Sequence, residues 1–350
     1  MVYDSTFNNE SSSKKIANLT IKKRIPVYAF FELTRHCNLN CSHCYIVQEK
    51  KHELSTSEVK SAIGQLKKEN CLILNFSGGE VFTRKDFFDI AWYAKDNGFA
   101  IKIFTNGALI DRDKADELAK LKPLRVEITI YSIEPQVHDS ITSVKGSLRD
   151  SLTALRLLKE KKVPLRIKCP LMRQNASGYK DIINLAEDIG AKYQFDTNIL
   201  PKTNGLKKAC NFQIGRKTLA NVFNDPKISI NEKKILNQLD SHENDIFCGA
   251  AHNSCAITAY GDVLACIALP IRSGNLRKQP FSKIWQSSYV LQQIRAARMD
   301  DRSDCFRCGL SIYCNKCPGL AYLNEGDIFA KTKRACVLAA IRKNILKPNR

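Results

Sequence analysis

Three cysteines stand close together near the start of the chain, in the stretch TRHCNLNCSHCY. Cys37, Cys41 and Cys44 are separated by three and then by two residues, so a single loop can bring their sulfurs to one ligand. Zinc takes four protein ligands in a structural site, or three plus water in a catalytic site. A 4Fe–4S cluster normally takes four thiolates. The spacing alone therefore leaves open a zinc site, a cluster with one iron unligated by protein, and a chance arrangement.

A second group of cysteines lies in the last third of the chain. Its eight members are Cys248, Cys255, Cys266, Cys305, Cys308, Cys314, Cys317 and Cys336. Eight thiolates divide into two complete sets of four, which suits two clusters, although CxxC pairs also bind zinc. Cys71, Cys169 and Cys210 stand apart, and we expect Cys71 and Cys169 to pack as small buried side chains.

Composition indicates the cellular compartment and the kind of chemistry expected of these thiols. The chain has 350 residues, with 55 basic against 35 acidic side chains and a formal charge of +20. It has no apolar run long enough for a membrane span and no secretory signal at its polar N-terminus, so we expect a cytoplasmic protein without a membrane partner. A reducing compartment favours metal or redox roles for cysteine over disulfides. The basic residues are spread in pairs along the chain, which suits a solvated surface or an acidic partner.

Short apolar runs alternate with amphipathic stretches over the first 200 residues. The runs at 27–33, 71–76, 100–104, 125–132, 164–172 and 192–199 predict six strands. The stretches at 53–70, 84–98, 111–121, 147–161 and 179–189 predict helices, the first with Ser55 and Glu58 as a capping box. This alternation predicts an α/β fold with a parallel core, either an open doubly wound sheet or a partial barrel.

In both architectures the chemistry belongs at the carboxyl ends of the strands. Polar or glycine-rich pieces do follow the predicted strands. They are TRHCNLNC after the first, SGGE after the second, TNG after the third, YSIE after the fourth and TNILP after the sixth. The sequence thus predicts that the first cysteine group shares one edge of the sheet with these pieces.

The motif CxxxCxxC followed by an aromatic residue, with GGE about 35 residues later, resembles the radical S-adenosylmethionine (SAM) superfamily. The resemblance covers residues 27 to about 200 and implies a partial (β/α)6 TIM-like barrel. It implies that Cys37, Cys41 and Cys44 hold a 4Fe–4S cluster whose fourth iron chelates SAM. It also implies a set of SAM contacts: His43, Tyr45, Gly78, Gly79, Glu80, Asn106, Ser132 and Lys168.

The C-terminal cysteines follow the order C-x12-G-x4-C, CxxC-x5-C and then C, which resembles the SPASM domain of many radical SAM enzymes. That resemblance implies two auxiliary 4Fe–4S clusters, for three clusters in all. The one nearer the barrel would be held by Cys248, Cys255, Cys266 and Cys317, and the outer one by Cys305, Cys308, Cys314 and Cys336. Two residues separate Cys314 from Cys317 where the commonest form has three, and Ile267 follows Cys266 where sulfatase-maturing members carry an aspartate. The second departure weighs against sulfatase maturation.

These resemblances divide the chain into three parts. Residues 1–25 are expected to be a flexible lead-in, residues 26–235 the barrel and residues 236–350 the SPASM domain with its two clusters. Within the barrel part, residues from 201 onward are lysine-rich and weakly periodic, so we interpret 201–245 as a connector.

The resemblance implies an oxidoreductase that reductively cleaves SAM to a 5′-deoxyadenosyl radical. We expect it to abstract hydrogen from a ribosomally made peptide and install a thioether or carbon–carbon crosslink, or another oxidation. Its partners would be a peptide or protein substrate, with an acidic leader as one form, and an electron donor such as flavodoxin or ferredoxin. The alternatives are a peptide epimerase with Cys210 as hydrogen-atom donor, and a radical enzyme acting as a decarboxylase or dehydrogenase on a small molecule. A zinc-containing nucleic-acid binder is the non-enzyme alternative, although no RNA-binding motif is present and nucleic acid is not the expected partner.

Overall fold

The fold is built on one nine-stranded sheet with the order β6-β5-β4-β3-β2-β1-β7-β8-β9. The computed structural model describes residues 10–229, 246, 248–298, 305 and 307–345. Strands β1 to β7 pair with one another in parallel, whereas β8 pairs antiparallel with both β7 and β9. The strands are β1 (Tyr28–Thr34), β2 (Ile73–Gly78), β3 (Ala100–Thr105), β4 (Arg125–Thr129), β5 (Leu165–Pro170), β6 (Lys192–Asp196), β7 (Ser254–Ile257), β8 (Asp262–Cys266) and β9 (Leu269–Asn275).

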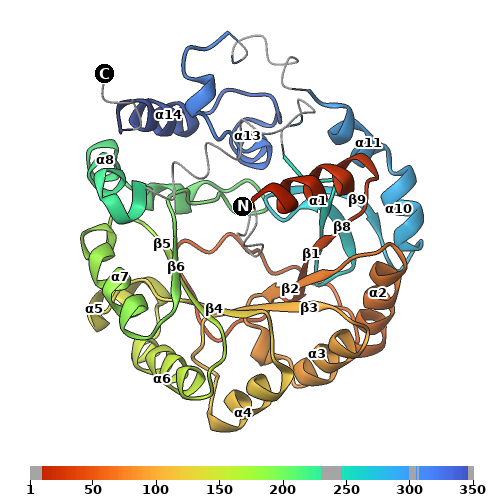
Figure 1. The fold of residues 1–350 in the computed structure, drawn as a ribbon, viewed down its shortest axis with the longest axis horizontal. Coiled ribbons are helices and arrows are strands. Elements are labelled where there is room, and N and C mark those ends of the chain that lie inside the picture. Colours follow the sequence, from red (N-terminus) through yellow and green to blue (C-terminus); the bar gives the residue numbers. More distant parts are fainter. Residues whose placement is uncertain (1–9, 230–245, 247, 299–304, 306, 346–350) are drawn as a thin grey trace.

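Helices surround this curved sheet (Figure 1). Those that follow the parallel strands are α2 (Thr56–Lys68), α3 (Phe87–Asp96), α4 (Arg112–Leu121), α5 (Pro135–Thr142), α6 (Ser147–Glu160), α7 (Tyr179–Asp188) and α8 (Arg216–Asn224). Those after the antiparallel strands are α10 (Phe281–Ser287), α11 (Tyr289–Ala296), α13 (Pro318–Glu325) and α14 (Lys333–Ile345). The predicted α/β class with a partial barrel is confirmed, and α5 is a helix that the sequence analysis did not predict.

The first predicted helix shows how closely local chemistry determines these elements. Ser55 caps α2 through its side chain, and Glu58 bonds back to the Ser55 backbone, so the predicted capping box is present. The buried face of α2 is Val59, Ala62, Ile63 and Leu66. These residues join the main hydrophobic core, which lies between the sheet and the helices.

Strand β1, which leads into the first cysteine group, lies between β2 and β7. Phe31 pairs with Phe76 of β2 on one side and with Ile257 of β7 on the other. Because β7, β8 and β9 come from the predicted SPASM region, the sheet runs across the predicted boundary at residue 235. The division into domains stays a prediction, but the two parts share one sheet.

The inner faces of the strands differ from the near-continuous apolar runs expected of a parallel core. Side chains that face the helices are apolar, whereas alternate positions carry buried polar groups such as Glu32, Lys102 and Glu127. Arg125 donates two hydrogen bonds to Glu127, at 3.0 and 2.8 Å, from the same strand. The inside of the barrel is therefore charged over much of its wall.

One part of that interior is apolar instead. Phe30, Ala256, Leu264 and Ile267 form a small buried cluster there, and Tyr28, Tyr45, Phe104 and Cys266 pack against it. These residues come from β1, β3, β7, the β8 region and the cysteine loop. We refer to Phe30, Ala256, Leu264 and Ile267 as the interior apolar cluster.

Two segments expected to be irregular are partly ordered. Within the predicted lead-in, residues Glu10–Lys22 form helix α1, where Ile21 is buried and Thr20 accepts a 3.3 Å hydrogen bond from Asn253. Within the predicted connector, Leu219 and Phe223 of α8 belong to the main core. Residues 1–9 and 230–245 lie outside the described part of the chain. The sequence analysis missed both helices because their apolar stripes are short.

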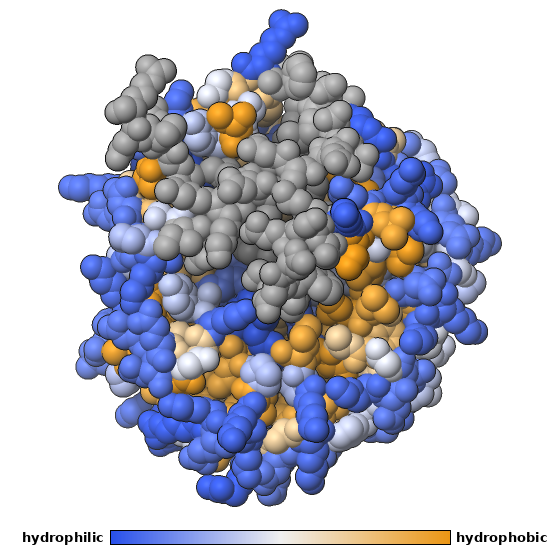
Figure 2. Space-filling view, viewed as in Figure 1, coloured by the Kyte–Doolittle hydropathy of each residue, from blue (hydrophilic) through white to orange (hydrophobic). Residues whose placement is uncertain are grey.

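The surface in Figure 2 is hydrophilic around its circumference, and hydrophobic residues lie nearer the middle of that face. Charged residues are thus spread over the outer helices, as their scatter in the sequence predicts. Across the described residues, no helix combines the length and the apolar character that membrane crossing requires.

Candidate metal centre and active site

The first three cysteines are neighbours in the loop that follows β1. Cys37 is exposed, and Cys41 and Cys44 are half-buried. The amide of Leu39 donates to Cys37 Sγ at 3.4 Å, and the amide of Cys44 donates to the Cys41 carbonyl at 3.0 Å. Burial raises the pKa of Cys41 to about 11, and the nearby thiols of Cys44 and Cys37 add to this shift. The three thiols thus lie in one loop, at the carboxyl end of β1.

Gly78 and Gly79 bring the end of β2 into backbone contact with the start of this loop. The Gly79 amide donates to the Thr34 carbonyl, and the Glu80 amide donates to the His36 carbonyl, each at 2.8 Å. A Cβ on Gly78 would lie 2.1 Å from the Thr34 carbonyl oxygen, and one on Gly79 would lie 2.2 Å from that of His36. Gly78 also has a φ of +149°. The glycines are therefore required by the chain's own packing. Their predicted contact with SAM stays a prediction.

Glu80 ties the end of β2 to the end of β3. It is fully buried, and its carboxylate accepts hydrogen bonds from Thr105 Oγ1 at 2.7 Å and from the Asn106 amide at 2.7 Å. It also accepts one from the Phe82 amide at 3.2 Å. Burial raises the pKa of Glu80, and these three bonds oppose that rise. In this structure Glu80 positions the Asn106 loop, and its role toward the SAM amino group stays a prediction.

Asn106 connects the β3 loop to the cysteine loop. Its side-chain amide donates to Asn38 Oδ1 at 2.8 Å and lies 4.0 Å from Cys37 Sγ. Its Oδ1 accepts a 2.8 Å bond from the Ala108 amide. The predicted SGGE and TNG pieces therefore meet the first cysteine group, as their places at neighbouring strand ends imply.

Tyr131, at the end of β4, is a functional candidate that the sequence analysis missed. Its hydroxyl lies 3.5 Å from Cys41 Sγ as a donor and 2.9 Å from His43 Nε2. Burial lowers the pKa of His43 to about 4, so this ring is neutral at pH 7. Tyr131 belongs to the stretch YSIE, which the sequence analysis placed at the end of the fourth strand. Of that stretch, only Ser132 was predicted to contact SAM. Tyr131 fixes the second half of the cysteine loop from across the barrel.

Three other predicted SAM contacts have local partners. Ser132 is buried, and its hydroxyl accepts a 3.0 Å bond from the Glu134 amide. Lys168 Nζ lies 4.2 Å from the centre of the Phe104 ring and 3.8 Å from Asp196 Oδ2. The Tyr45 ring packs on the interior apolar cluster. Their contacts with SAM stay predictions.

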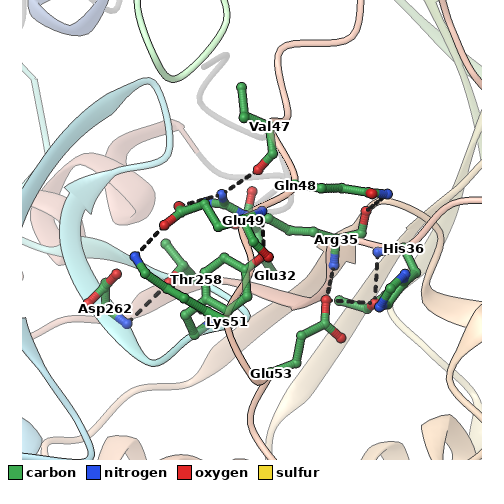
Figure 3. Close-up of polar contacts among 12 residues, drawn as sticks. Glu32, Arg35, His36, Val47, Gln48, Glu49, Lys51, Glu53, Thr258 and Asp262 are labelled. Atoms are coloured by element: carbon green, nitrogen blue, oxygen red, sulfur yellow. Dashed lines mark hydrogen bonds and ion pairs between the residues drawn. The ribbon is translucent and has the colours of Figure 1, made fainter.

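Arg35 joins both ends of the cysteine loop (Figure 3). Its guanidinium donates to the Val47 carbonyl at 2.7 Å and to Glu49 at 3.0 Å, and it lies 3.4 Å from Glu32. Its own amide donates to Glu53 at 2.6 Å. The side chain is almost buried and stacks 4.9 Å over the Tyr260 ring. The sequence analysis did not predict a role for Arg35, because its partners lie on segments that meet only after folding.

We expect Arg35→Met to destabilise the protein by roughly 3–5 kcal/mol, the usual cost of removing one partner of a buried ion pair. Glu32 would lose its cation, and Val47 and Glu49 would lose their hydrogen bonds to the guanidinium. Thermal unfolding of the anaerobically purified protein measures this, with Lys50→Met, an exposed lysine in the same segment, as the control. Equal stability of the two variants would contradict the assignment.

Glu32 is a buried carboxylate on the inner side of β1. Burial raises the pKa of Glu32 to about 7, and the charge of Arg35 opposes that rise. Its Oε1 has no hydrogen-bond partner among the described residues. Glu32 also contributes to the raised pKa of Tyr45 and of Cys44. The acid therefore lies close to the cysteine loop, inside the barrel.

Three C-terminal cysteines gather at the far end of β8. Burial raises the pKa of Cys266 to about 12, and the thiols of Cys317 and Cys248 contribute to that shift. Cys317 precedes α13, and the first turn of this helix packs on the β8–β9 turn so closely that a Cβ on Gly319 would lie 2.4 Å from the Ala268 carbonyl. That close approach brings Cys317 next to Cys266.

Cys255, the predicted fourth member of this set, is buried in the sheet. It is a buried residue of β7, paired with Ala29 of β1. Burial raises its pKa well above the usual value, and the thiol that adds to the shift is Cys71. The Cys255 side chain belongs to the main core, against which Cys248 and Cys266 also pack. Joint ligation by these thiols and that of Cys317 stays a prediction.

The outer four cysteines are all half-buried. Cys305 and Cys308 are linked by a 3.2 Å backbone hydrogen bond from the Cys308 amide. Cys314 follows the short helix η5 (Ser311–Tyr313), which packs against α14, where Cys336 lies in the first turn. These contacts bring the segments together, and joint ligation by the four thiols stays a prediction.

Cys210 lies in the short helix η3 (Lys208–Phe212), half-buried, with its Sγ 3.8 Å from the Ile199 carbonyl. Its neighbour Ala209 belongs to a small buried cluster with Tyr131, against which Cys41 packs. The segment that carries Cys210 therefore borders the first cysteine group. A role for Cys210 as a hydrogen-atom donor stays a prediction.

The donor set fits an iron–sulfur cluster in its chemistry. Thiolates are the ligands of such clusters, and each thiol must lose its proton to bind iron, which the metal itself promotes. Within the described ranges, no three His, Cys, Asp or Glu side chains are grouped so as to hold a single metal ion. The first three thiols are nevertheless neighbours in one loop, and the residues around them are held by Gly79, Glu80 and Arg35.

Two family models match the chain in the two regions just described. The model of the radical SAM superfamily matches residues 31–186. The model of the SPASM iron–sulfur cluster-binding domain matches residues 248–309. The first match contains Cys37, Cys41 and Cys44, and the second contains Cys248 and Cys266.

The chain is similar along most of its length to a heme synthase and to a bacteriocin biosynthesis protein. An AdoMet-dependent heme synthase of Methanosarcina barkeri is 25% identical over 85% of this chain and 92% of its own length. The subtilosin biosynthesis protein AlbA of Bacillus subtilis, an antilisterial bacteriocin biosynthesis protein, is 26% identical over 84% of this chain and 67% of its own. The solved structure of Streptococcus suis SuiB bound to its precursor peptide SuiA has a TM-score of 0.72 at 16% identity, covering 96% of this chain and 84% of that one. That structural likeness supports the fold.

Proposed function

Because the chain belongs to the radical SAM superfamily and carries a C-terminal SPASM domain, we propose that it is an oxidative peptide maturase. Its substrate would be a ribosomally made peptide, in which it forms a thioether or carbon–carbon crosslink with the net loss of two hydrogen atoms. When bound, the cluster and SAM supply a radical able to remove hydrogen from an unactivated C–H bond.

The chain's own residues would prepare the site for that chemistry. Cys37, Cys41 and Cys44 would hold the first cluster, and Cys305, Cys308, Cys314 and Cys336 the outer auxiliary one. Gly78 and Gly79 let the β2 end press against the cysteine loop, while Glu80 fixes the Asn106 loop. Tyr131 holds Cys41 and His43 in place through its hydroxyl. These contacts hold the loop that carries the three thiols in one arrangement.

One observation carries the proposal: the first cysteine group and the Cys266 group border the same part of the barrel interior. Tyr45, directly after Cys44, packs on the interior apolar cluster, and so does Cys266. Burial raises the pKa of Tyr45 well above its usual value, and both Cys44 and Cys266 add to that shift. A substrate radical formed here would lie near a second redox site, which suits a crosslink because forming one removes an electron from the substrate after hydrogen abstraction.

The relatives support a peptide substrate through the bacteriocin biosynthesis protein, and the excess of basic residues suits an acidic leader segment. Flavodoxin or ferredoxin is the proposed electron donor. A cytoplasmic setting follows from the reducing conditions that such thiols need.

The test is anaerobic turnover of the iron-loaded protein with SAM, dithionite and a candidate precursor peptide that carries an acidic leader segment. We expect 5′-deoxyadenosine together with a peptide that has lost two hydrogens by mass spectrometry. A peptide of unchanged mass but with an altered residue configuration would indicate the epimerase instead. A colourless protein with zinc and no cleavage of SAM would contradict the whole proposal.

A second function, on a small molecule, is favoured by the heme synthase, of which the chain spans 92%. The charged barrel interior, with Lys102, Arg125 and Lys168, suits a substrate that carries carboxylates. An iron porphyrin with propionate groups serves as the probe in the same assay. Loss of carbon dioxide from this probe, with no change in the peptide, would select the small-molecule function.

A further inference from the structure

Tyr131 is fixed at the end of β4 by contacts of its main chain and of its ring. Its amide donates to His138 Nδ1 at 3.3 Å, and its carbonyl accepts a 2.9 Å hydrogen bond from the Asn175 side chain. The residue belongs to a small buried cluster, and its exposed fraction is 6%. The centre of its ring lies 5.3 Å from the centres of the His43 and His138 rings. The fold therefore places the Tyr131 hydroxyl against the cysteine loop.

That hydroxyl has two polar neighbours but a single proton to donate. Cys41 Sγ lies 3.5 Å away as an acceptor, and His43 Nε2 lies 2.9 Å away. A thiolate can only accept a hydrogen bond, whereas the Nε2 atom of a neutral imidazole can carry a proton. Once Cys41 has lost its proton to bind iron, the hydroxyl donates to the sulfur and accepts from His43. Each of the three polar groups then has a partner.

The bond to Cys41 differs in its surroundings from the bonds to Cys37. The Leu39 amide donates to Cys37 Sγ at 3.4 Å, and the Asn106 side-chain amide lies 4.0 Å from the same sulfur. Cys37 is exposed, whereas Cys41 is half-buried and packs against the cluster that contains Tyr131. A hydrogen bond is electrostatically stronger in a low-dielectric interior than in water. The Tyr131 hydroxyl thus acts on the better shielded of these two sulfurs.

We propose that the Tyr131 hydroxyl donates to the Cys41 sulfur and thereby raises the reduction potential of the cluster proposed for the first cysteine group, which we call the first site. Hydrogen bonds to the sulfurs help to set the potentials of iron–sulfur clusters. Such a bond stabilises the reduced form more than the oxidised form, because the reduced form carries one more negative charge. Tyr131 acts through Cys41 and is therefore a positioning residue. The inference rests on the proposed function and deepens it, since it concerns how readily the first site takes up an electron.

The test is Tyr131→Phe in the full chain after anaerobic reconstitution, because this change removes one oxygen atom and keeps the ring. Redox titration followed by electron paramagnetic resonance gives the midpoint potential of each cluster. The signal that is absent from the triple alanine variant of the first cysteine group is assigned to the first site. At the midpoint potential of the unmodified protein, we expect the ratio of reduced to oxidised first site to fall about threefold or more. The iron content and the potentials of the auxiliary signals should stay unchanged.

Tyr179→Phe is the matched control. It removes the same atom, but from a hydroxyl on α7 that lies 2.9 Å from Asp225 Oδ2, and the first-site potential should equal that of the unmodified protein. A first-site potential in Tyr131→Phe that is unchanged or more positive would overturn the inference, and would leave the proposed function in place. A triple alanine variant that keeps every signal would contradict the ligation by the first cysteine group, and both proposals would then fail.

A second variant tests the inference even if Tyr131→Phe does not assemble the cluster. Incorporation of 3-fluorotyrosine in place of Tyr131 keeps the ring and the hydroxyl, and the fluorine makes the hydroxyl a stronger donor because it withdraws electron density. We expect the first-site potential to move to a more positive value, opposite to the change in Tyr131→Phe. A potential that stays the same or becomes more negative would show that this bond does not set it, which would overturn the inference.

Discussion

Replacing Cys37, Cys41 and Cys44 together by alanine is expected to lower the rate of SAM cleavage at least 1,000-fold, to the background of the assay. The reason is local: these thiols supply every cysteine that the loop after β1 offers to a cluster, and a 4Fe–4S cluster depends on thiolate ligands. The same variant should lose about four irons per chain. Its auxiliary iron should remain, because Cys266 and its neighbours lie on other strands and helices. The measurements are 5′-deoxyadenosine by chromatography and total iron by a colorimetric assay.

Cys169→Ala provides the matched control. Its thiol is buried on β5 and lies 3.6 Å from the Tyr131 carbonyl, so its removal perturbs the same region of the barrel without touching the loop. We expect this control to keep its iron and its SAM cleavage. Cleavage that survives in the triple variant would show that the loop is not the catalytic site.

Gly79→Ala is expected to abolish SAM binding and to destabilise the fold by about 1–3 kcal/mol or more, the usual cost of overpacking. The added Cβ would meet backbone atoms 2.2, 2.6 and 2.8 Å away, all from Arg35 and His36. Backbone cannot move aside as the end of a flexible side chain can. The strand β2 or the cysteine loop must therefore shift, and the bond from Glu80 to His36 would break. Equilibrium dialysis with labelled SAM measures the binding, and thermal unfolding measures the stability.

The control for this change is Gly215→Ala. Gly215 precedes α8, has no positive φ and would place its Cβ in open space. The same chemical substitution there should lower the free energy of unfolding by about 1 kcal/mol or less, the cost of a poorer N-cap residue, and should leave SAM binding unchanged. If Gly79→Ala bound SAM as well as Gly215→Ala does, close packing of the two loops could not be a requirement of the site.

Much of the barrel and of its first site was predictable, because the signals are local. The capping box of Ser55 and Glu58, the apolar runs and the polar pieces after them can all be read within a few residues of one another. Strand ends that share an edge then bring SGGE and TNG to the cysteine loop. The contacts of Glu80 and Asn106 with that loop agree with this expectation.

The remainder depends on partners that are distant in the sequence. Arg35 contacts segments on both sides of the loop and Tyr260 some 225 positions later, and no local pattern announces such an arrangement. Counting thiols assigns Cys255 a ligand role, which stays a prediction, but the count does not foresee that its side chain is buried in the main core. Nothing in the sequence near β7 indicates that this short strand pairs with β1.

The place of β1 between β2 and β7 has a consequence for synthesis of the chain. As the protein leaves the ribosome, β1 can pair with β2 early, but its other edge has no partner until residues 254–257 have emerged. For that interval the strand that leads to the cysteines exposes a row of unpaired backbone groups, which is the kind of edge that aggregates. Helix α1 and the cysteine loop would then form while the β1 edge of the sheet still lacks β7. Aggregation during translation, before β7 has paired with β1, is then the expected cause of any low yield of this protein. Chaperones that cover the open edge of β1 would raise the yield, whereas stabilising the finished fold would not.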